Sequence, residues 1–208
     1  KPYAITRLAT DHVRTPPVDD ALGGEVGGDI KYAVTPNLTA DLTLNTDFAQ
    51  VEIDEQQVNL TRFSLFFPEK RDFFLEGRGI FDFARGGTGA TNGLGGADTP
   101  YLFYTRRIGL NNGAVIHINE GGRLTGKLGP WAIGLMNIQT GRDAASATGA
   151  TNFSIVRLKR DVLSRSSIGV MATNRSLATL GKGSNAAYAA DGTFLLSQEL
   201  TAGTYWAQ

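Results

Sequence analysis

The chain has 208 residues and a formal net charge of zero, so no electrostatic argument favours nucleic acid or an anionic membrane surface as a partner. Cysteine is absent and histidine occurs only twice, which excludes disulfides, thiol catalysis, zinc–thiolate sites and multi-histidine metal sites. No apolar run approaches the ~20 residues of a membrane helix. We also expect no cofactor.

The first 26 residues are rich in proline and glycine, with the run TPPVDDALGG, and contain few residues suited to packing. This composition is typical of a connection between domains, so we predict that residues 1–26 form a linker from a preceding domain. No signal peptide begins at Lys1, and the final residues TYWAQ resemble the middle of a strand. We therefore expect the chain to be a segment of a longer protein.

A β-hairpin is predicted next, from strands at Asp29–Val34 and Leu38–Asn45 with a turn at Thr35-Pro36-Asn37. Apolar and polar residues alternate in each strand, which gives the hairpin one apolar and one polar face. The apolar positions of the second strand are Leu38, Ala40, Leu42 and Leu44. A sheet on a soluble core has the same pattern, so this hairpin alone does not separate a membrane barrel from a soluble β-sandwich.

The stretch from Gln57 to Gly77, QVNLTRFSLFFPEKRDFFLEG, combines many aromatic residues with charges of both signs. Because buried charges must be paired or kept wet, we predict that it lies in a partly polar protein interior and that its charges pair there. We call this predicted interior segment the buried anchor. The residues expected in it are Phe63, Phe66, Phe67, Glu69, Lys70, Arg71, Phe73, Phe74 and Glu76. The alternative is an ordinary buried turn with surface ion pairs.

Residues 47–98 do not fit simple strands. If the strands of the chain belong to a β-barrel, as the second half of the sequence suggests below, these residues are too many for one turn between strands. We predict that part of this region folds inward and fills the lumen of that barrel. An acidic cluster within it is a weak candidate for a hard cation such as calcium; its members are Asp47, Glu52, Asp54 and Glu55. The glycine and alternating aspartates of a calcium loop are absent, which favours a polar rim or lumen face instead. Paired carboxylates also suggest a glycosidase, but spacing in the sequence does not establish the separation that such a pair requires, and we predict no catalytic residue.

Two adjacent cations, Arg106 and Arg107, lie in the run LFYTRRIG. A strand would send them to opposite faces, so one of them would be able to reach the carboxylates of the Phe-rich segment. The alternative is an exposed basic pair at the end of a strand.

The second half of the chain alternates short turns with long loops of small residues, which is the rhythm of an outer-membrane barrel. Its predicted strands are 122–128, 131–140, 153–160, 167–174, 188–197 and 204–207. Strands of about nine to eleven residues suit a tilted membrane crossing, and four aromatic residues near strand ends suit its interfaces; these are Trp131, Tyr188, Tyr205 and Trp206. Arg157 and Lys159 share a face with Phe153 and Ile155, which snorkelling near an interface would tolerate.

The sequence of Gly27–Gly77, GGDIKYAVTPNLTADLTLNTDFAQVEIDEQQVNLTRFSLFFPEKRDFFLEG, closely resembles a family of bacterial proteins. In that family a family-9-like carbohydrate-binding module precedes a long domain of unknown function, thought to be an outer-membrane β-barrel. The resemblance continues at Leu102–Gly109, LFYTRRIG. It implies architecture, a location in the bacterial outer membrane and a link to sugars, and it carries over no catalytic residue.

We therefore predict an all-β chain whose antiparallel up-and-down strands, about eight to ten in number, form part of an outer-membrane β-barrel over residues 27–208, with an inward-folded Phe-rich segment. The expected function is non-enzymatic, the binding or passage of carbohydrate-like material. The alternatives are an anchor for a surface partner and a soluble secreted β-sandwich that binds carbohydrate. Expected partners are outer-membrane lipid, with glycans or another envelope protein, and no nucleic acid.

Overall fold

A computed structural model describes the greater part of the chain, and all structural statements below concern this part. The described residues are 2–11, 18–46, 69–84, 100–111, 114–144, 146–163, 165–177, 183–197 and 200–208.

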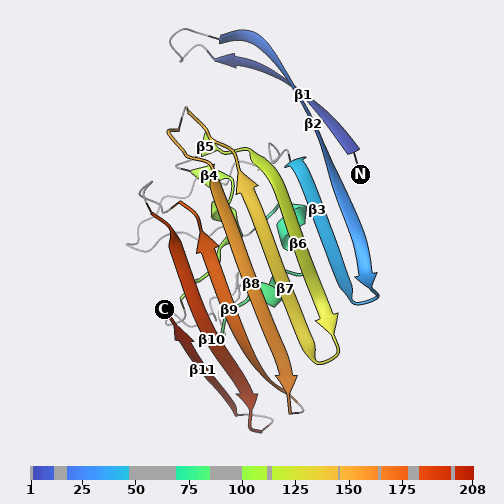
Figure 1. Ribbon diagram of the computed structural model, residues 1–208, viewed down its shortest axis with the longest axis vertical. Helices are drawn as coiled ribbons and strands as arrows, with labels where there is room; N and C mark the ends of the chain where they lie inside the picture. The colour runs from blue at the N-terminus through green and yellow to red at the C-terminus, as the bar shows by residue number, and fades with distance from the viewer. Residues whose placement is uncertain are drawn as a thin grey trace.

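Nine antiparallel strands form one large sheet in which strands close in sequence are neighbours in space (Figure 1). The strands are β1 (Pro2–Asp11), β2 (Val18–Thr35), β3 (Leu38–Thr46), β6 (Ile118–Leu128), β7 (Trp131–Thr140), β8 (Thr151–Val162), β9 (Ser166–Arg175), β10 (Asn185–Leu195) and β11 (Thr201–Ala207). The order is β1-β2-β3-β6-β7-β8-β9-β10-β11. This confirms an all-β, antiparallel, up-and-down architecture. As described, the sheet has β1 and β11 at its two edges and does not close on itself.

The hairpins predicted from alternation are confirmed. β2 and β3 pair around the turn at Pro36 and Asn37, with Ile30 opposite Leu42. β6 and β7 join at Gly129-Pro130, where Gly129 has the positive φ of +59° that glycine adopts without strain. β8 pairs with β9 and β10 with β11 through short connections, as expected.

Residues 1–26, predicted to be a linker from a preceding domain, contain β1 and the first half of β2, which pair with each other. This pair projects beyond the other strands in Figure 1. Glycine residues in β2 weaken the sequence pattern that identifies a strand. In the structure a side chain of the neighbouring strand β1 lies over one of these glycines. The Tyr3 ring lies over Gly27, and its hydroxyl donates to the carbonyl oxygen of Asn45 on β3 at 3.2 Å.

Short elements between β3 and β6 lie against one face of the sheet, behind the strands in the view of Figure 1. They are the helical turn α1 (Asp72–Leu75), the 3-10 turns η1 (Arg78–Phe81) and η2 (Thr105–Arg107), and the small strands β4 (Leu110–Asn111) and β5 (Ala114–Val115). We name residues 69–84 the strap and the face that they contact the strap face. Among the described residues, no helix is long and apolar enough to cross a membrane.

On β3 and β6 the two faces of the sheet have the reverse of the usual polarity, although the strap face also carries the apolar core. On the strap face, Asp41, Thr43 and Arg123 are buried, together with an apolar cluster that includes Phe74, Phe81, Ile138 and Ile155. On the other face, Leu42 and Leu44 are 54% and 56% exposed. The alternation of β3 was predicted correctly, and from Asp41 to Leu44 it is the polar side that is buried; Leu38, at the start of the strand, is buried as well.

Candidate functional site

The strap crosses the strap face from β3 and β6 at one end to β10 and β11 at the other. Strand glycines provide the room for it: a Cβ on Gly134 of β7 would lie 2.8 Å from both Ile80 Cγ2 and Phe81 Cε1. The strap turns between α1 and η1 at Gly77, whose φ of +67° suits glycine. The backbone of the sheet is therefore shaped to hold this segment closely.

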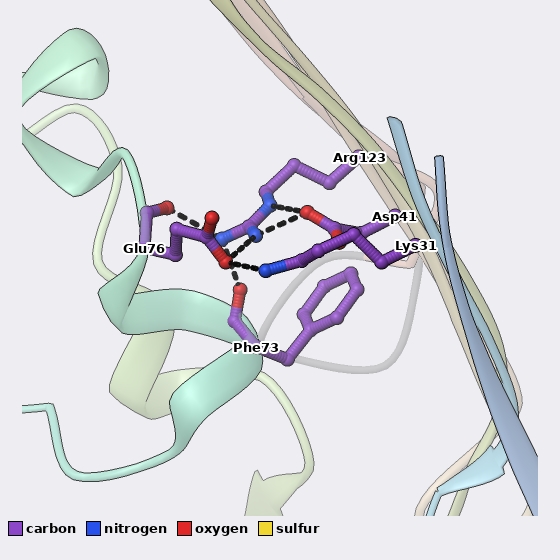
Figure 2. A network of polar contacts seen from close by, with 5 residues as sticks. All are labelled: Lys31, Asp41, Phe73, Glu76 and Arg123. Atoms are coloured by element: carbon purple, nitrogen blue, oxygen red, sulfur yellow. Dashed lines mark hydrogen bonds and ion pairs between the residues drawn. The ribbon is translucent and has the colours of Figure 1, made fainter. Parts of the chain in front are cut away.

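We call Phe73–Glu76 the first end of the strap on the sheet, and a network of charges from three strands holds it there (Figure 2). Arg123 on β6 donates to Asp41 on β3, with Nε 3.2 Å from Oδ2, and its Nη1 donates to the backbone oxygens of Phe73 and Glu76 on the strap. The Arg123 guanidinium also lies 5.1 Å from the centroid of the Phe73 ring. Arg123 thus joins sheet and strap from a side chain that is only 1% exposed.

Glu76 completes this network from the strap. Its carboxylate accepts a hydrogen bond from Lys31 Nζ on β2, and Arg123 Nη2 lies 3.3 Å from Oε2. The bond from Lys31 is the main cause that lowers the pKa of Glu76, against a smaller opposing effect of burial. Lys31 also lies 3.7 Å from Asp41. Two cations from the sheet therefore meet one carboxylate from the sheet and one from the strap.

A second buried ion pair lies within the strap itself. Glu69 Oε2 accepts from Arg71 Nη2 at 2.8 Å, and the two side chains are 5% and 4% exposed. Arg71 also donates to the carbonyl oxygens of Thr105 and Ile108, each at 2.6 Å, and stacks 4.2 Å from the Phe74 centroid. Burial raises the pKa of Glu69, but the hydrogen bonds and charge of Arg71 outweigh burial and lower it. This pair joins the strap to η2.

The far end of the strap meets a third pair of charges. Arg157 on β8 binds both carboxylate oxygens of Asp191 on β10, with Nη2 2.9 Å from Oδ2. Its guanidinium lies over Gly169 of the strand between them. Asp191 Oδ2 then accepts from the backbone N–H of Ala84 at 3.1 Å, and the Phe83 ring packs edge-on against Tyr205 of β11, 5.8 Å between centroids.

One small hollow lies between the strap and its surroundings in the described part of the chain. This hollow, of about 10 Å³, lies beside α1 and η2 and has room for roughly one water molecule. Its lining includes Glu69, Phe74, Phe81 and Phe103. Apolar and ionic contacts thus fill this part of the interior, and no group of three potential metal ligands gathers among the described residues.

The residues predicted for the buried anchor lie in several environments. Phe74, Glu69 and Arg71 are buried, Phe73 is half-buried, and Lys70 and Glu76 are exposed. Arg106 is buried and Arg107 is exposed, but both lie on the 3-10 turn η2, so the predicted strand at this position is wrong. The remaining predicted residues lie outside the described part of the chain; they are Phe63, Phe66, Phe67, Asp47, Glu52, Asp54 and Glu55.

Sequence reasoning missed the residues of the sheet that hold the strap. These are Lys31, Asp41, Arg123, Arg157 and Asp191. Asp41 was placed on the polar face of its hairpin, but nothing in the sequence identified its partner. Snorkelling at an interface was wrong for Arg157, which is 0% exposed and paired. The available signal was a charge inside an otherwise apolar strand face, which requires a buried partner.

Comparison with known proteins gives one family. The model of a domain of unknown function, DUF5916, matches residues 2–137. No curated protein matches the chain, and no solved structure matches it. The matched region contains β1–β3, the strap and the Lys31–Asp41–Arg123–Glu76 network, and it extends over more than half of the sequence. On this match the chain belongs to the DUF5916 family.

Proposed function

We propose that this chain forms part of an outer-membrane β-barrel whose wall is the nine-stranded sheet and whose interior holds the strap. The observation that carries the proposal is the reversed polarity of the sheet. A soluble sheet buries its apolar face and exposes its polar face, whereas a membrane barrel wall places apolar residues outward and polar residues inward. Here Leu42 and Leu44 are exposed while Asp41 and Arg123 are buried.

Cross-strand register extends this argument over most of the sheet. Directly opposed residues in antiparallel strands share a face, and one row on the exposed face is apolar across seven strands. The row is Tyr32, Ala40, Leu124, Leu135, Val156, Ala172 and Tyr188. Such a row on the exposed face supports lipid as its neighbour, since exposed apolar patches of this extent are rare on soluble monomers.

Both borders of the apolar rows have side chains suited to a membrane interface. On one side Asn137 donates to Asn152 and Ser154, at 3.0 and 2.7 Å. On the other side the Arg160 guanidinium lies 5.3 Å from the Trp131 ring, a pairing of cation and aromatic that suits the headgroup region. Leu42 on β3 and Asn137 on β7 lie in the same cross-strand row through Gly122. This row is therefore apolar at β3 and polar at β7, as expected if the strands are tilted in the bilayer.

The role proposed for the barrel is non-enzymatic. The resemblance of Gly27–Gly77 to barrels that follow a carbohydrate-binding module supports capture or passage of carbohydrate-like material. A second candidate is an anchor for a surface partner, and the ionic contacts that tie the strap to the sheet support it. Conductance and glycan-binding measurements on the intact protein separate them, because an anchor would give neither signal.

The membrane proposal is tested with the two tryptophans of the chain, Trp131 and Trp206, which are 41% and 56% exposed. In bilayers of brominated lipids we expect their fluorescence to be quenched. The single variants Trp131→Phe and Trp206→Phe assign the quenching, and Trp131 should respond most to bromine near the headgroups. A protein recovered from the periplasm without detergent, and not quenched, would refute the proposal and favour a soluble β-sandwich.

A further inference from the structure

We propose that Lys31 and Arg123 form a carboxylate-binding site on the strap face, which Glu76 of the strap occupies in this structure. A carboxylate-bearing ligand would bind there by displacing Glu76 and would release the first end of the strap. The proposal rests on the contacts of these residues and holds whether or not the sheet lies in a membrane.

The first argument is that the site exists on the sheet without the strap. Arg123 is fixed by its bonds to Asp41, with Nε 3.2 Å from Oδ2, and its side chain is 1% exposed. Lys31 lies 3.7 Å from the same aspartate. Arg123 and Lys31 share the Asp41 carboxylate, so these three groups together keep one positive charge for an anion to neutralise.

The second argument is that the occupant is reachable from solvent. The side chains of Glu76 and Lys31 are 50% and 56% exposed, while Arg123 forms the buried floor. An external carboxylate is therefore able to approach Lys31 before Glu76 has left. The lowered pKa of Glu76, caused mainly by its bond from Lys31, agrees with a site that prefers an ionised carboxylate.

The third argument concerns affinity. Glu76 belongs to the same chain, so its effective concentration at the site is in the millimolar range or above. A simple carboxylate should therefore bind poorly to the wild-type protein and measurably once Glu76 is removed. A ligand with further contacts to the strap face would be needed to displace Glu76 itself.

The experiment uses the full chain with Glu76→Ala and sodium acetate as the probe, against sodium chloride at equal ionic strength. Hydrogen exchange of residues 69–84 reports strap docking, and exchange of β7 and β8 reports that the sheet is folded. We expect Glu76→Ala to speed exchange in the strap by about fivefold, the lower end of the change that loss of one modest interaction produces. Acetate should reverse most of this change and have no effect on the wild type.

Two further variants make the result specific. Adding Lys31→Gln to Glu76→Ala should abolish the effect of acetate, because one of the two cations is lost. Glu120→Ala removes an exposed glutamate from β6 and should leave exchange unchanged. The proposal is overturned if acetate acts no better than chloride on Glu76→Ala. It is also overturned if removing Glu76 leaves strap exchange unchanged. Should Glu76→Ala fail to fold, Glu76→Gln, which keeps the side-chain shape and removes the charge, is tested by strap exchange without acetate, and unchanged exchange again overturns the proposal.

Discussion

Replacing Glu69 with alanine should destabilise the protein far more than breaking a surface ion pair. Glu69 and Arg71 are 5% and 4% exposed, so the substitution leaves a cation buried beside an apolar ring. Breaking a buried pair from one side typically costs about 3–5 kcal/mol. Arg71 keeps its bonds to the carbonyl oxygens of Thr105 and Ile108, which places the expected loss near the lower end of that range.

The chain contains its own control for this measurement. Lys127 and Asp161 form an ion pair at 3.0 Å with side chains 60% and 53% exposed, and Asp161→Ala should cost at most about 1 kcal/mol. The double variant Glu69→Leu/Arg71→Leu removes both buried charges and should be more stable than Glu69→Ala. Chemical unfolding in detergent gives the global free energy, and hydrogen exchange of residues 69–84 shows whether the loss is confined to the strap. If Glu69→Ala matches Asp161→Ala in both measurements, the strap is not anchored by a buried pair.

Three further changes test the strap and the proposed membrane face. Gly134→Val should cost about 1–3 kcal/mol by overpacking against Phe81, whereas Gly122→Ala, near only a flexible leucine on the other face, should cost less; equal losses would contradict the fit of the strap on β7. Because the pKa of Glu76 is lowered, its contribution is complete above the ordinary value of 4.5 and is lost as pH falls through the lowered pKa. Strap exchange, corrected for intrinsic rates, should therefore rise only in acid, and a rise beginning near neutral pH would contradict this. Val156→Arg should cost about 2–4 kcal/mol in a bilayer, while a loss within about 0.5 kcal/mol would indicate a solvated face.

Much of the sheet was predictable because alternation and turn chemistry act locally. The turn at Gly129-Pro130 and the alternation of Leu38–Asn45 each indicate a strand pair without knowledge of the rest of the chain. β1 was missed because proline and glycine in residues 1–26 are typical of a connection between domains. The contact between Tyr3 and Gly27, which joins β1 to β2, is not revealed by that composition. Local signals therefore identified the pairing of most strands and not the extent of the sheet.

The contacts of the strap were not predictable, because they join residues far apart in sequence. Arg123 and Asp41 are separated by 82 residues, and Ala84 and Asp191 by 107. The composition of Gln57–Gly77 required that its charges be satisfied, and it left their partners open. An isolated cation in an apolar strand face, such as Arg157, marks a position where such a partner is needed.

The two ends of the strap are held by different kinds of contact. This difference determines which end is able to respond to salt or a ligand. At the far end Arg157 and Asp191 neutralise each other, and the strap adds no charge to this pair: it contributes the backbone N–H of Ala84 and the ring of Phe83. At the first end Lys31 and Arg123 face Asp41, so the sheet keeps one positive charge until Glu76 docks. Salt or a competing carboxylate weakens a partly exposed ionic contact. The same agents act less on the Arg157–Asp191 pair, whose side chains are 0% and 5% exposed. Opening of the strap should therefore begin at Phe73–Glu76 while Phe83 and Ala84 stay attached.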